Sequence, residues 1–205
     1  MVEFAWSPGF AVSQKQKSIR ALHNASAEIG ISPILEVSTK SPDPLGVRLS
    51  AFNLAVDASD RSIPLEAALQ GSKVFQNGGP FTDLFELKGS AVKRDVRLHS
   101  SGQLVAFDWN GDWWPLEPKT AFYDWLYINA LNALGVGDEL RHYAGFTDIE
   151  FNPAKSINCQ ARSCALYVSL GSRGVLQPVL ASTPGTFRRL LTRHPPEKGS
   201  QNPLF

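Results

Sequence analysis

Apolar residues recur at helical spacing in several stretches of the chain, and these stretches predict its helices. The first predicts a helix over residues 13–29, which Gly30 ends. The longest covers residues 118–134, and because apolar residues follow its whole length we expect it in the core. A later apolar face predicts a helix that ends at Gly171, and Thr183 is suited to cap a short basic helix.

Two shorter segments alternate apolar and polar residues, as strands with one buried face do. They cover residues 34–39 and 47–56 on either side of a proline-rich turn at 42–46, so we expect them to pair antiparallel. Asn110-Gly111 lies between two further apolar runs and predicts a second hairpin over residues 103–116. The pattern as a whole predicts an α+β fold, a single compact domain that is mainly helical with short antiparallel strands and hairpins.

The chain of 205 residues is long enough for one domain with a single core. We place that domain at residues 1–193, and we expect the basic, proline-rich tail at 194–205 to be disordered. With 20 basic and 19 acidic residues the net charge is only +1, which excludes the general positive field of a non-specific nucleic-acid binder. Any contact with nucleic acid must therefore be local.

The two cysteines, Cys159 and Cys164, match neither the spacing of a zinc motif nor that of a disulfide framework. We interpret them as small core residues of a protein in a reducing compartment. The chain opens without a secretory signal, and no apolar run approaches the roughly 20 residues that span a bilayer. These features predict a cytoplasmic protein that does not bind membranes.

The segment over residues 64–73 places three polar side chains on one side of a predicted helix. Pro64 suits the first helical position. Glu66, Gln70 and Lys73 follow at i, i+4 and i+7 spacing. Because Glu66 lies in the first turn, where burial can tune its protonation, the stripe is a candidate acid/base site. The alternative is a solvated helix face, with the glutamate and the lysine too far apart to pair.

Several familiar catalytic motifs are missing from the chain. It has no glycine-rich phosphate loop, no pair of metal-binding histidines and no nucleophile elbow, so we expect neither a metal nor a cofactor. Catalysis must then rest on carboxylates and lysines. Lys40 stands out because it ends a predicted strand beside a helix N-terminus, where a partly desolvated amine could act as a nucleophile. The alternative for Lys40 is an exposed lysine in a turn.

Further candidates lie in the second half of the chain, where Asp148 opens a polar run. Asn158 and Arg162 are four residues apart in a predicted helix, so both could face a cleft, where an arginine can hold a diphosphate. They could instead be a helix cap and a surface arginine. Trp114 and Tyr123 belong to a dense aromatic segment whose rings could stack on a base or, as is commoner, pack in the core.

Six blocks of residues occur in one order over nearly the whole chain. They are residues 13–18, 36–41, 45–54, 66–79, 114–125 and 146–170. In this order and spacing they resemble the NADAR superfamily, and within it the antitoxins encoded beside DarT-type DNA ADP-ribosyltransferases. For the antitoxin branch these motifs are long and specific.

The resemblance implies an ADP-ribosylhydrolase that removes ADP-ribose from guanine bases in single-stranded DNA and so reverses a DarT-type toxin. The leaving amine needs a proton donor, a role that the resemblance gives to Glu66. Lys40 could form a Schiff base with the opened sugar. The resemblance further implies that the distal ribose and phosphates are held by Asn53, Gln70 and Lys73, and that the far side is closed by Asp148, Asn158 and Arg162.

Three alternatives stay open beside this activity. The same cleft could hold ADP-ribose or modified DNA without turnover, or the protein could neutralise its toxin by direct contact. It could also cleave the N-glycosidic bond of a free metabolite. Turnover separates a hydrolase from the first two, and a stable complex with unmodified toxin singles out direct contact.

Overall fold

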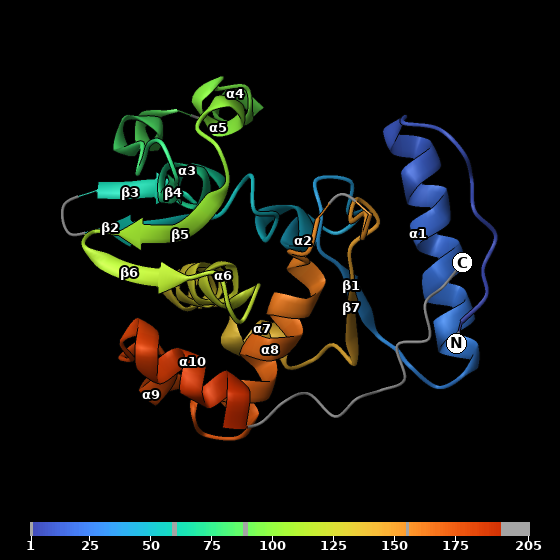
Figure 1. The fold of residues 1–205 in the computed structure, drawn as a ribbon. Helices are drawn as coiled ribbons and strands as arrows, with labels where there is room; N and C mark the ends of the chain where they lie inside the picture. The colour runs from blue at the N-terminus through green and yellow to red at the C-terminus, as the bar shows by residue number, and fades with distance from the viewer. Residues whose placement is uncertain (1, 59–60, 88–89, 155, 194–205) are drawn as a thin grey trace.

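The computed structural model describes residues 2–58, 61–87, 90–154 and 156–193. Its first helix, α1 (Val12–Glu28), begins and ends within a residue of the expected bounds and lies at one side of the molecule (Figure 1). The N-cap is Ala11 and not Ser13. The chain leaves the helix at Gly30, whose φ of +80° is a conformation that favours glycine.

Next to α1, strand β1 (Ile34–Glu36) pairs with β7 (Gly145–Thr147), and the pairing is parallel (Figure 1). The expected antiparallel pairing of residues 34–39 with 47–56 is therefore wrong. Parallel strands need a long crossover between them, and here most of the chain forms it. As a result, the carboxyl ends of β1 and β7 lie side by side, with Glu36 opposite Thr147.

The residues after β1 form a short helix, α2 (Pro44–Arg48), and not the first part of a strand over 47–56. Asp43 caps this helix by accepting a hydrogen bond from the backbone N–H of Leu45 (2.8 Å), and Pro44 occupies its first position. The proline-rich run that we expected to be a turn therefore begins a helix.

Two small antiparallel sheets follow in the chain (Figure 1). The first joins β2 (Ala55–Ala58) to β3 (Arg61–Pro64) and leads directly into helix α3 (Leu65–Gly71). The second has the order β4-β5-β6, and its strands are Lys73–Phe75, Leu104–Trp109 and Asp112–Pro115. The β5–β6 hairpin turns at Asn110 and Gly111, which both have positive φ, so this prediction is confirmed.

Helix α6 (Ala121–Leu134) forms the centre of the core, as expected, and packs against α3, α8, α10 and β2. Its fully buried side chains include Leu126, Tyr127, Ile128 and Leu131. With 14 residues it is shorter than α1, which has 17, so it is not the longest helix as we expected. Gly135 ends it in the left-handed conformation, with a φ of +70°.

The remaining elements cover this core. They are η1 (Thr82–Glu86), α4 (Ser90–Lys93), α5 (Arg97–Ser100), α7 (Gly137–Leu140), α8 (Gln160–Ser172), α9 (Leu176–Leu180) and α10 (Pro184–Arg193). Helices α9 and α10 lie together below the β5–β6 hairpin in Figure 1. The whole is a single compact α+β domain, as the sequence pattern predicts.

Three further expectations concern the cysteines, membrane-spanning segments and the C-terminal tail. Cys164 is buried and Cys159 half-buried, and both are free thiols. Among the helices that the structure describes, none combines the length and the apolar character that crossing a membrane requires. The tail expected at 194–205 lies outside the described residues.

Candidate functional site

A cleft opens beside helix α3, bounded by α4 on one side and by the loop between β7 and α8 on the other. Two adjoining hollows form it, with volumes of about 450 and about 740 Å³. Both hollows are lined by Leu69, Gln70, Lys93, Ser156 and Asn158. Because they share this wall, a single ligand can extend from one into the other.

The two hollows differ in charge. The smaller one, which we call the carboxylate lobe, is lined by Glu66, Asp148 and Glu150 together with Phe52, Tyr123 and Asn152. The larger one, which we call the lysine lobe, is lined by Lys73, Lys93 and Lys119 together with Glu117, Leu104, Phe107 and Leu116. The cleft therefore has an acidic end and a basic end.

Glu66 lies in the first turn of α3 and is buried, with 6% of its surface exposed. Its Oε1 accepts a hydrogen bond from Gln70 Nε2 (2.8 Å) and is 3.3 Å from the Nζ of Lys93. Lys93 also lies over the ring of Phe52, 4.9 Å from the ring centre. The alternative of a solvated helix face is therefore wrong, because Glu66 and Gln70 are both buried and bonded to each other.

Lys73 does not continue the stripe on α3, because the helix ends at Gly71 and Lys73 is the first residue of β4. Its side chain lines the lysine lobe. Burial lowers the pKa of Lys73, the nearby Glu66 carboxylate opposes this shift, and the positive charge of Lys93 adds to it. Lys73 and Lys93 therefore bring two cations close to the same carboxylate.

Asp148 follows β7 and lines the carboxylate lobe. Its Oδ2 accepts from Gln160 Nε2 (3.2 Å) and its Oδ1 from the backbone N–H of Glu150 (3.1 Å). Burial and the negative charge of Glu36 raise the pKa of Asp148 to about 6, against the smaller opposing effect of these hydrogen bonds. Asp148 can therefore hold or release a proton close to neutral pH.

Glu36, which the sequence did not single out as a site residue, fixes the segment that carries Asp148. It is 1% exposed, and it accepts hydrogen bonds from Thr147 Oγ1 (2.6 Å) and from the backbone N–H of Ile149 (2.8 Å). His23 of α1 completes the group through its Nε2, 2.9 Å from Thr147 Oγ1. Since the Thr147 hydroxyl proton points to Glu36, His23 donates to that hydroxyl.

Tyr123 of α6 lines the carboxylate lobe, and its side chain is buried. Burial and the carboxylates of Glu66 and Asp148 raise its pKa well above the usual value. The phenol is therefore neutral and can donate a hydrogen bond into the lobe.

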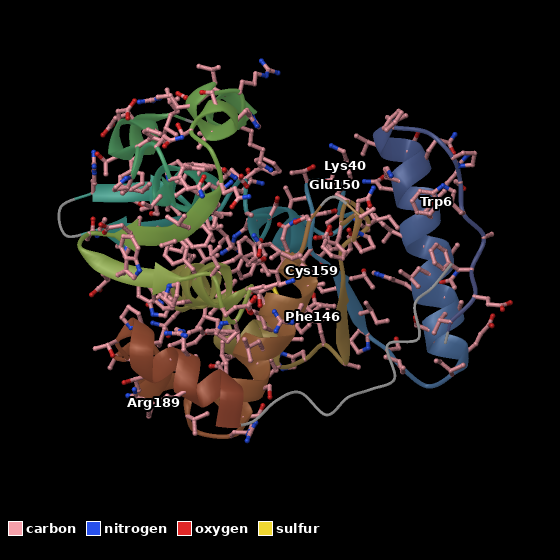
Figure 2. The ribbon with its side chains drawn as sticks, in the orientation of Figure 1. Trp6, Lys40, Phe146, Glu150, Cys159 and Arg189 are labelled. Atoms are coloured by element: carbon pink, nitrogen blue, oxygen red, sulfur yellow. The ribbon has the colours of Figure 1, made fainter. Side chains whose placement is uncertain are left out.

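Lys40 is not among the residues that line the carboxylate lobe, and it lies beside Glu150 (Figure 2). Its Nζ donates to Thr39 Oγ1 (3.0 Å) and is 3.8 Å from Oε1 of Glu150, which does line the lobe. The other carboxylate oxygen of Glu150 accepts from the hydroxyl of Thr39 (2.6 Å). Strand β1 ends at Glu36, so Lys40 does not end a strand as expected and lies in the turn that follows. The alternative of an exposed turn lysine is wrong in its exposure, since Lys40 is half-buried and paired.

Asn158 lines both lobes, but it precedes helix α8, whose N-cap is Cys159, so it does not share a helix face with Arg162. Arg162 is not among the residues that line the cleft. Its Nη1 donates to Asp124 Oδ2 and to Thr120 Oγ1, both at 2.7 Å. The structure therefore brings Asn158 to the cleft and uses Arg162 to tie α8 to α6.

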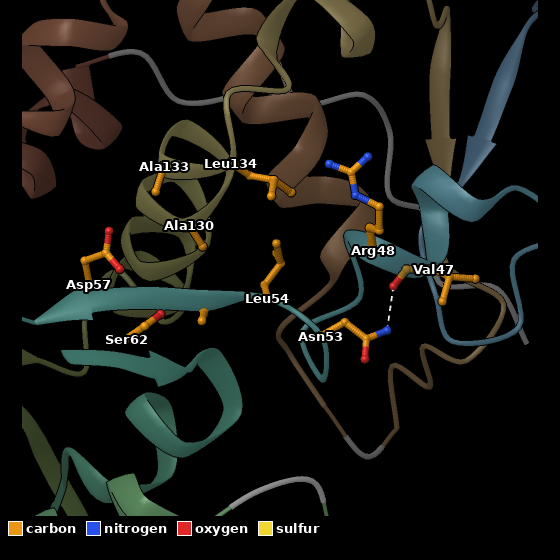
Figure 3. A pocket seen from close by; sticks show the side chains of 10 residues that line it. Val47, Arg48, Asn53, Leu54, Asp57, Ser62, Ala130, Ala133 and Leu134 are labelled. Atoms are coloured by element: carbon orange, nitrogen blue, oxygen red, sulfur yellow. Dashed lines mark hydrogen bonds between the residues drawn. The ribbon is translucent and has the colours of Figure 1, made fainter.

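Asn53 and Trp114 also lie away from the cleft. Asn53 lines a separate hollow of about 390 Å³ between α2, β2 and α6, where its amide donates to the backbone oxygen of Val47 at 2.7 Å (Figure 3). Trp114 is 1% exposed and packs against Phe122, Trp125 and Phe187. Neither side chain shares a pocket with Glu66.

Comparison with protein-family models now adds to this geometry. The model described as the DarT1-associated NADAR antitoxin matches residues 1–201. The chain belongs to this family. A search of curated proteins found no match. The family description associates such antitoxins with the DarT1 toxin, and membership of the NADAR family indicates a hydrolase that acts on ADP-ribose-related substrates.

In this NADAR antitoxin, the candidate chemistry belongs to carboxylates, lysines and a neutral phenol. Within the described ranges, no three histidine, cysteine, aspartate or glutamate side chains are grouped so as to hold a metal ion. Lys93 and Gln160 are among the cleft residues that the sequence did not single out. Lys93 lies in a four-residue helix with no pattern of its own, and Gln160 reaches the cleft because it also accepts from the backbone N–H of Ala51 (2.6 Å). Neither contact has a signal in the sequence.

Proposed function

We propose that this antitoxin hydrolyses the bond between ADP-ribose and the exocyclic amine of guanine in single-stranded DNA, and so reverses the modification made by its DarT1 partner. The observation that carries the proposal is Glu66, a buried carboxylate at the boundary of the two lobes, bonded to Gln70 and Lys93. Family membership supplies the substrate class.

The chemistry of the bond explains why such a carboxylate is needed. Cleavage must deliver a proton to the leaving guanine amine and must stabilise positive charge that develops at the anomeric carbon of the ribose. Glu66 is our candidate for the acid/base group, because Gln70 and Lys93 orient its carboxylate at the cleft wall. Asp148 and Tyr123, in the same lobe, offer an acceptor and a donor to sugar hydroxyls or base edges.

A covalent route through Lys40 is part of the proposal. When the ribose ring opens, its first carbon is an imine to the guanine amine, and a neutral lysine amine can add to that carbon. The guanine amine then leaves with a proton from Glu66, and a Schiff base to lysine remains. Water adds to this Schiff base, which releases ADP-ribose and restores the lysine. For this step Lys40 must move away from Glu150.

The test uses a single-stranded oligonucleotide that carries one ADP-ribosylated guanine, incubated with the full chain. We expect the wild type to restore the unmodified strand and Glu66→Gln to lose at least about a hundredfold in rate, the lower range for a general acid. Lys17→Ala serves as the control, because Lys17 is an exposed lysine of α1 outside the cleft. If the wild type binds the oligonucleotide and leaves it modified, the protein is a binding module and the proposal is wrong.

Borohydride trapping tests the covalent route separately. We expect the wild type to form an adduct of protein and ADP-ribose that is stable to denaturation, and Lys40→Ala to form none. Lys73→Ala is the matched comparison, since Lys73 is also a half-buried lysine, lines the cleft and has a lowered pKa. An adduct that is lost in Lys73→Ala and kept in Lys40→Ala would place the nucleophile at Lys73 and contradict the role given to Lys40.

A further inference from the structure

The two lobes of the cleft have opposite charge, and Glu66 lies at their boundary. Glu66 lines the carboxylate lobe, and its two partners, Gln70 and Lys93, line both lobes. If the bond that is broken lies next to Glu66, the two parts of the substrate that it joins therefore lie in different lobes. The substrate of the proposed function has two chemically different sides, a diphosphate that carries two negative charges and a guanine base that carries none.

The lysine lobe has the features of a phosphate site next to an apolar ring site. Lys73, Lys93 and Lys119 come from three separate segments and line the lobe together, and Glu117 is the one carboxylate among the described residues that line it. Lys119 is exposed, and its side chain makes no hydrogen bond or ion pair with any residue in the described part of the chain. An apolar wall in the same lobe is formed by Leu69, Leu104, Phe107 and Leu116, and Phe107 is the cross-strand neighbour of Lys73.

The carboxylate lobe has the opposite preference. Glu66, Asp148 and Glu150 line it, and among the described residues of its lining Lys93 is the only lysine or arginine, so a dianion placed there meets a net repulsion from them. Carboxylate and amide oxygens accept hydrogen bonds well from the N–H groups along the edge of guanine. At about 450 Å³ this lobe suits a single base, and the lysine lobe, at about 740 Å³, suits the larger ADP-ribose.

We propose that the substrate has one fixed direction in the cleft, with the diphosphate and adenine of ADP-ribose in the lysine lobe and the guanine in the carboxylate lobe. This inference rests on the proposed function for its substrate. It assigns diphosphate binding to Lys119 and Lys93, which have no role in the proposed chemistry beyond the contact of Lys93 with Glu66. It also assigns an apolar wall, Phe107 and Leu116, to the adenine ring.

Binding of free ADP-ribose to the full chain, measured by titration calorimetry, tests the direction. We expect Lys119→Ala to weaken binding about tenfold, the usual effect of losing one charge-assisted hydrogen bond to phosphate, and Lys119→Glu to weaken it further. Lys17→Ala, the exposed lysine of α1, leaves the affinity unchanged. Glu150→Gln removes a negative charge from the other lobe and leaves the affinity for ADP-ribose equal or tighter.

Two outcomes would overturn the assignment. One is loss of ADP-ribose affinity in Glu150→Gln with none in Lys119→Ala, which reverses the direction. The other is that Lys119→Glu binds ADP-ribose as the wild type does and binds an unmodified single-stranded oligonucleotide more weakly. That result would mean that the lysine lobe binds DNA phosphates. Neither outcome depends on turnover. A protein that binds ADP-ribose through Lys119 and does not restore modified DNA would leave the direction intact and contradict only the proposed hydrolysis.

Discussion

The charged side chains around the cleft differ mainly in what the fold places beside them. Glu66 has an amide and an ammonium within contact distance, whereas Asp148 has the negative charge of Glu36 nearby and a half-buried position. Similar carboxylates therefore have different surroundings, and for Asp148 burial and the like charge of Glu36 favour the neutral form. Residue types alone could suggest Glu66 as a site residue. They could not predict the effect of Glu36 on Asp148, because that effect follows from the β1–β7 pairing.

The raised pKa of Asp148 predicts a stability that depends on pH. Between the ordinary aspartate pKa of 3.8 and the folded value of about 6, the folded state holds a proton that the unfolded state has lost. The free energy of unfolding therefore falls as pH rises through this range. At pH values above it, the full destabilisation by the ionised Asp148 remains. Between about pH 4 and pH 7.5, we expect the free energy of unfolding of Asp148→Asn to rise by about 1 kcal/mol relative to that of the wild type. This figure is reduced for partial solvent screening.

Urea unfolding at several pH values measures this difference. Asp112→Asn is the control, because Asp112 is an exposed aspartate at the β5–β6 turn. Parallel pH curves for wild type and Asp148→Asn would show that Asp148 titrates normally in the folded protein.

Arg162 and Asp124 give a second prediction at this scale. Asp124 is 1% exposed, and its two oxygens accept from Arg162 and from Ser163 (both 2.7 Å). Arg162→Ala leaves a buried carboxylate without its cation, so we expect a loss of about 2–3 kcal/mol in the free energy of unfolding. Arg20→Ala, at an exposed position of α1, should change it by less than about 0.5 kcal/mol. A thermal or urea melt of Arg162→Ala that matches wild type would show that solvent already compensates Asp124.

At the scale of elements, the local sequence could predict the turns and helix ends that depend on a few neighbouring residues. The Asn110-Gly111 hairpin and the end of α6 at Gly135 could be predicted because each needs a positive φ. The strand expected over 47–56 failed because the Asp43 cap and Pro44 outweigh alternating polarity in so short a segment. Those two residues are a helix-start signal, so the short helix could have been predicted from the sequence.

Gly46 shows how tightly α2 packs against the end of β1. A Cβ at this position would lie 1.9 Å from the backbone oxygen of Glu36 and 2.4 Å from Ser41 Oγ. We expect Gly46→Ala to lose at least about 2 kcal/mol in the free energy of unfolding, because a backbone atom cannot yield as a flexible side chain can. Gly145→Ala is the matched control, since the nearest atoms to its added Cβ are 3.9 Å away. Equal denaturation midpoints for the two variants would mean that α2 can shift without cost.

At the scale of the whole molecule, the cleft joins parts of the chain that are far apart in sequence. Lys73 and Phe107 come from the β4–β5–β6 sheet, Lys93 from α4, and Asn158 from the loop before α8. No periodicity in one segment could predict this meeting, because it depends on the parallel pairing of β1 with β7 across most of the chain. Because these separate segments form the cleft only in the folded state, a ligand binds only the folded protein. Binding should therefore stabilise the entire domain.

Free ADP-ribose should therefore raise the melting temperature of the full chain. A ligand at about 100 times its dissociation constant adds about 2.7 kcal/mol to the free energy of unfolding, and for a domain of this size each kcal/mol corresponds to about 2–4 °C. We expect a rise of about 5–10 °C for the wild type by differential scanning calorimetry. Lys119→Ala, which binds about tenfold more weakly under our assignment, should show about half that rise at the same concentration because the effect is logarithmic. Ribose without the diphosphate is the control ligand, and an equal rise with ribose and with ADP-ribose would show that the lysine lobe does not hold the phosphates.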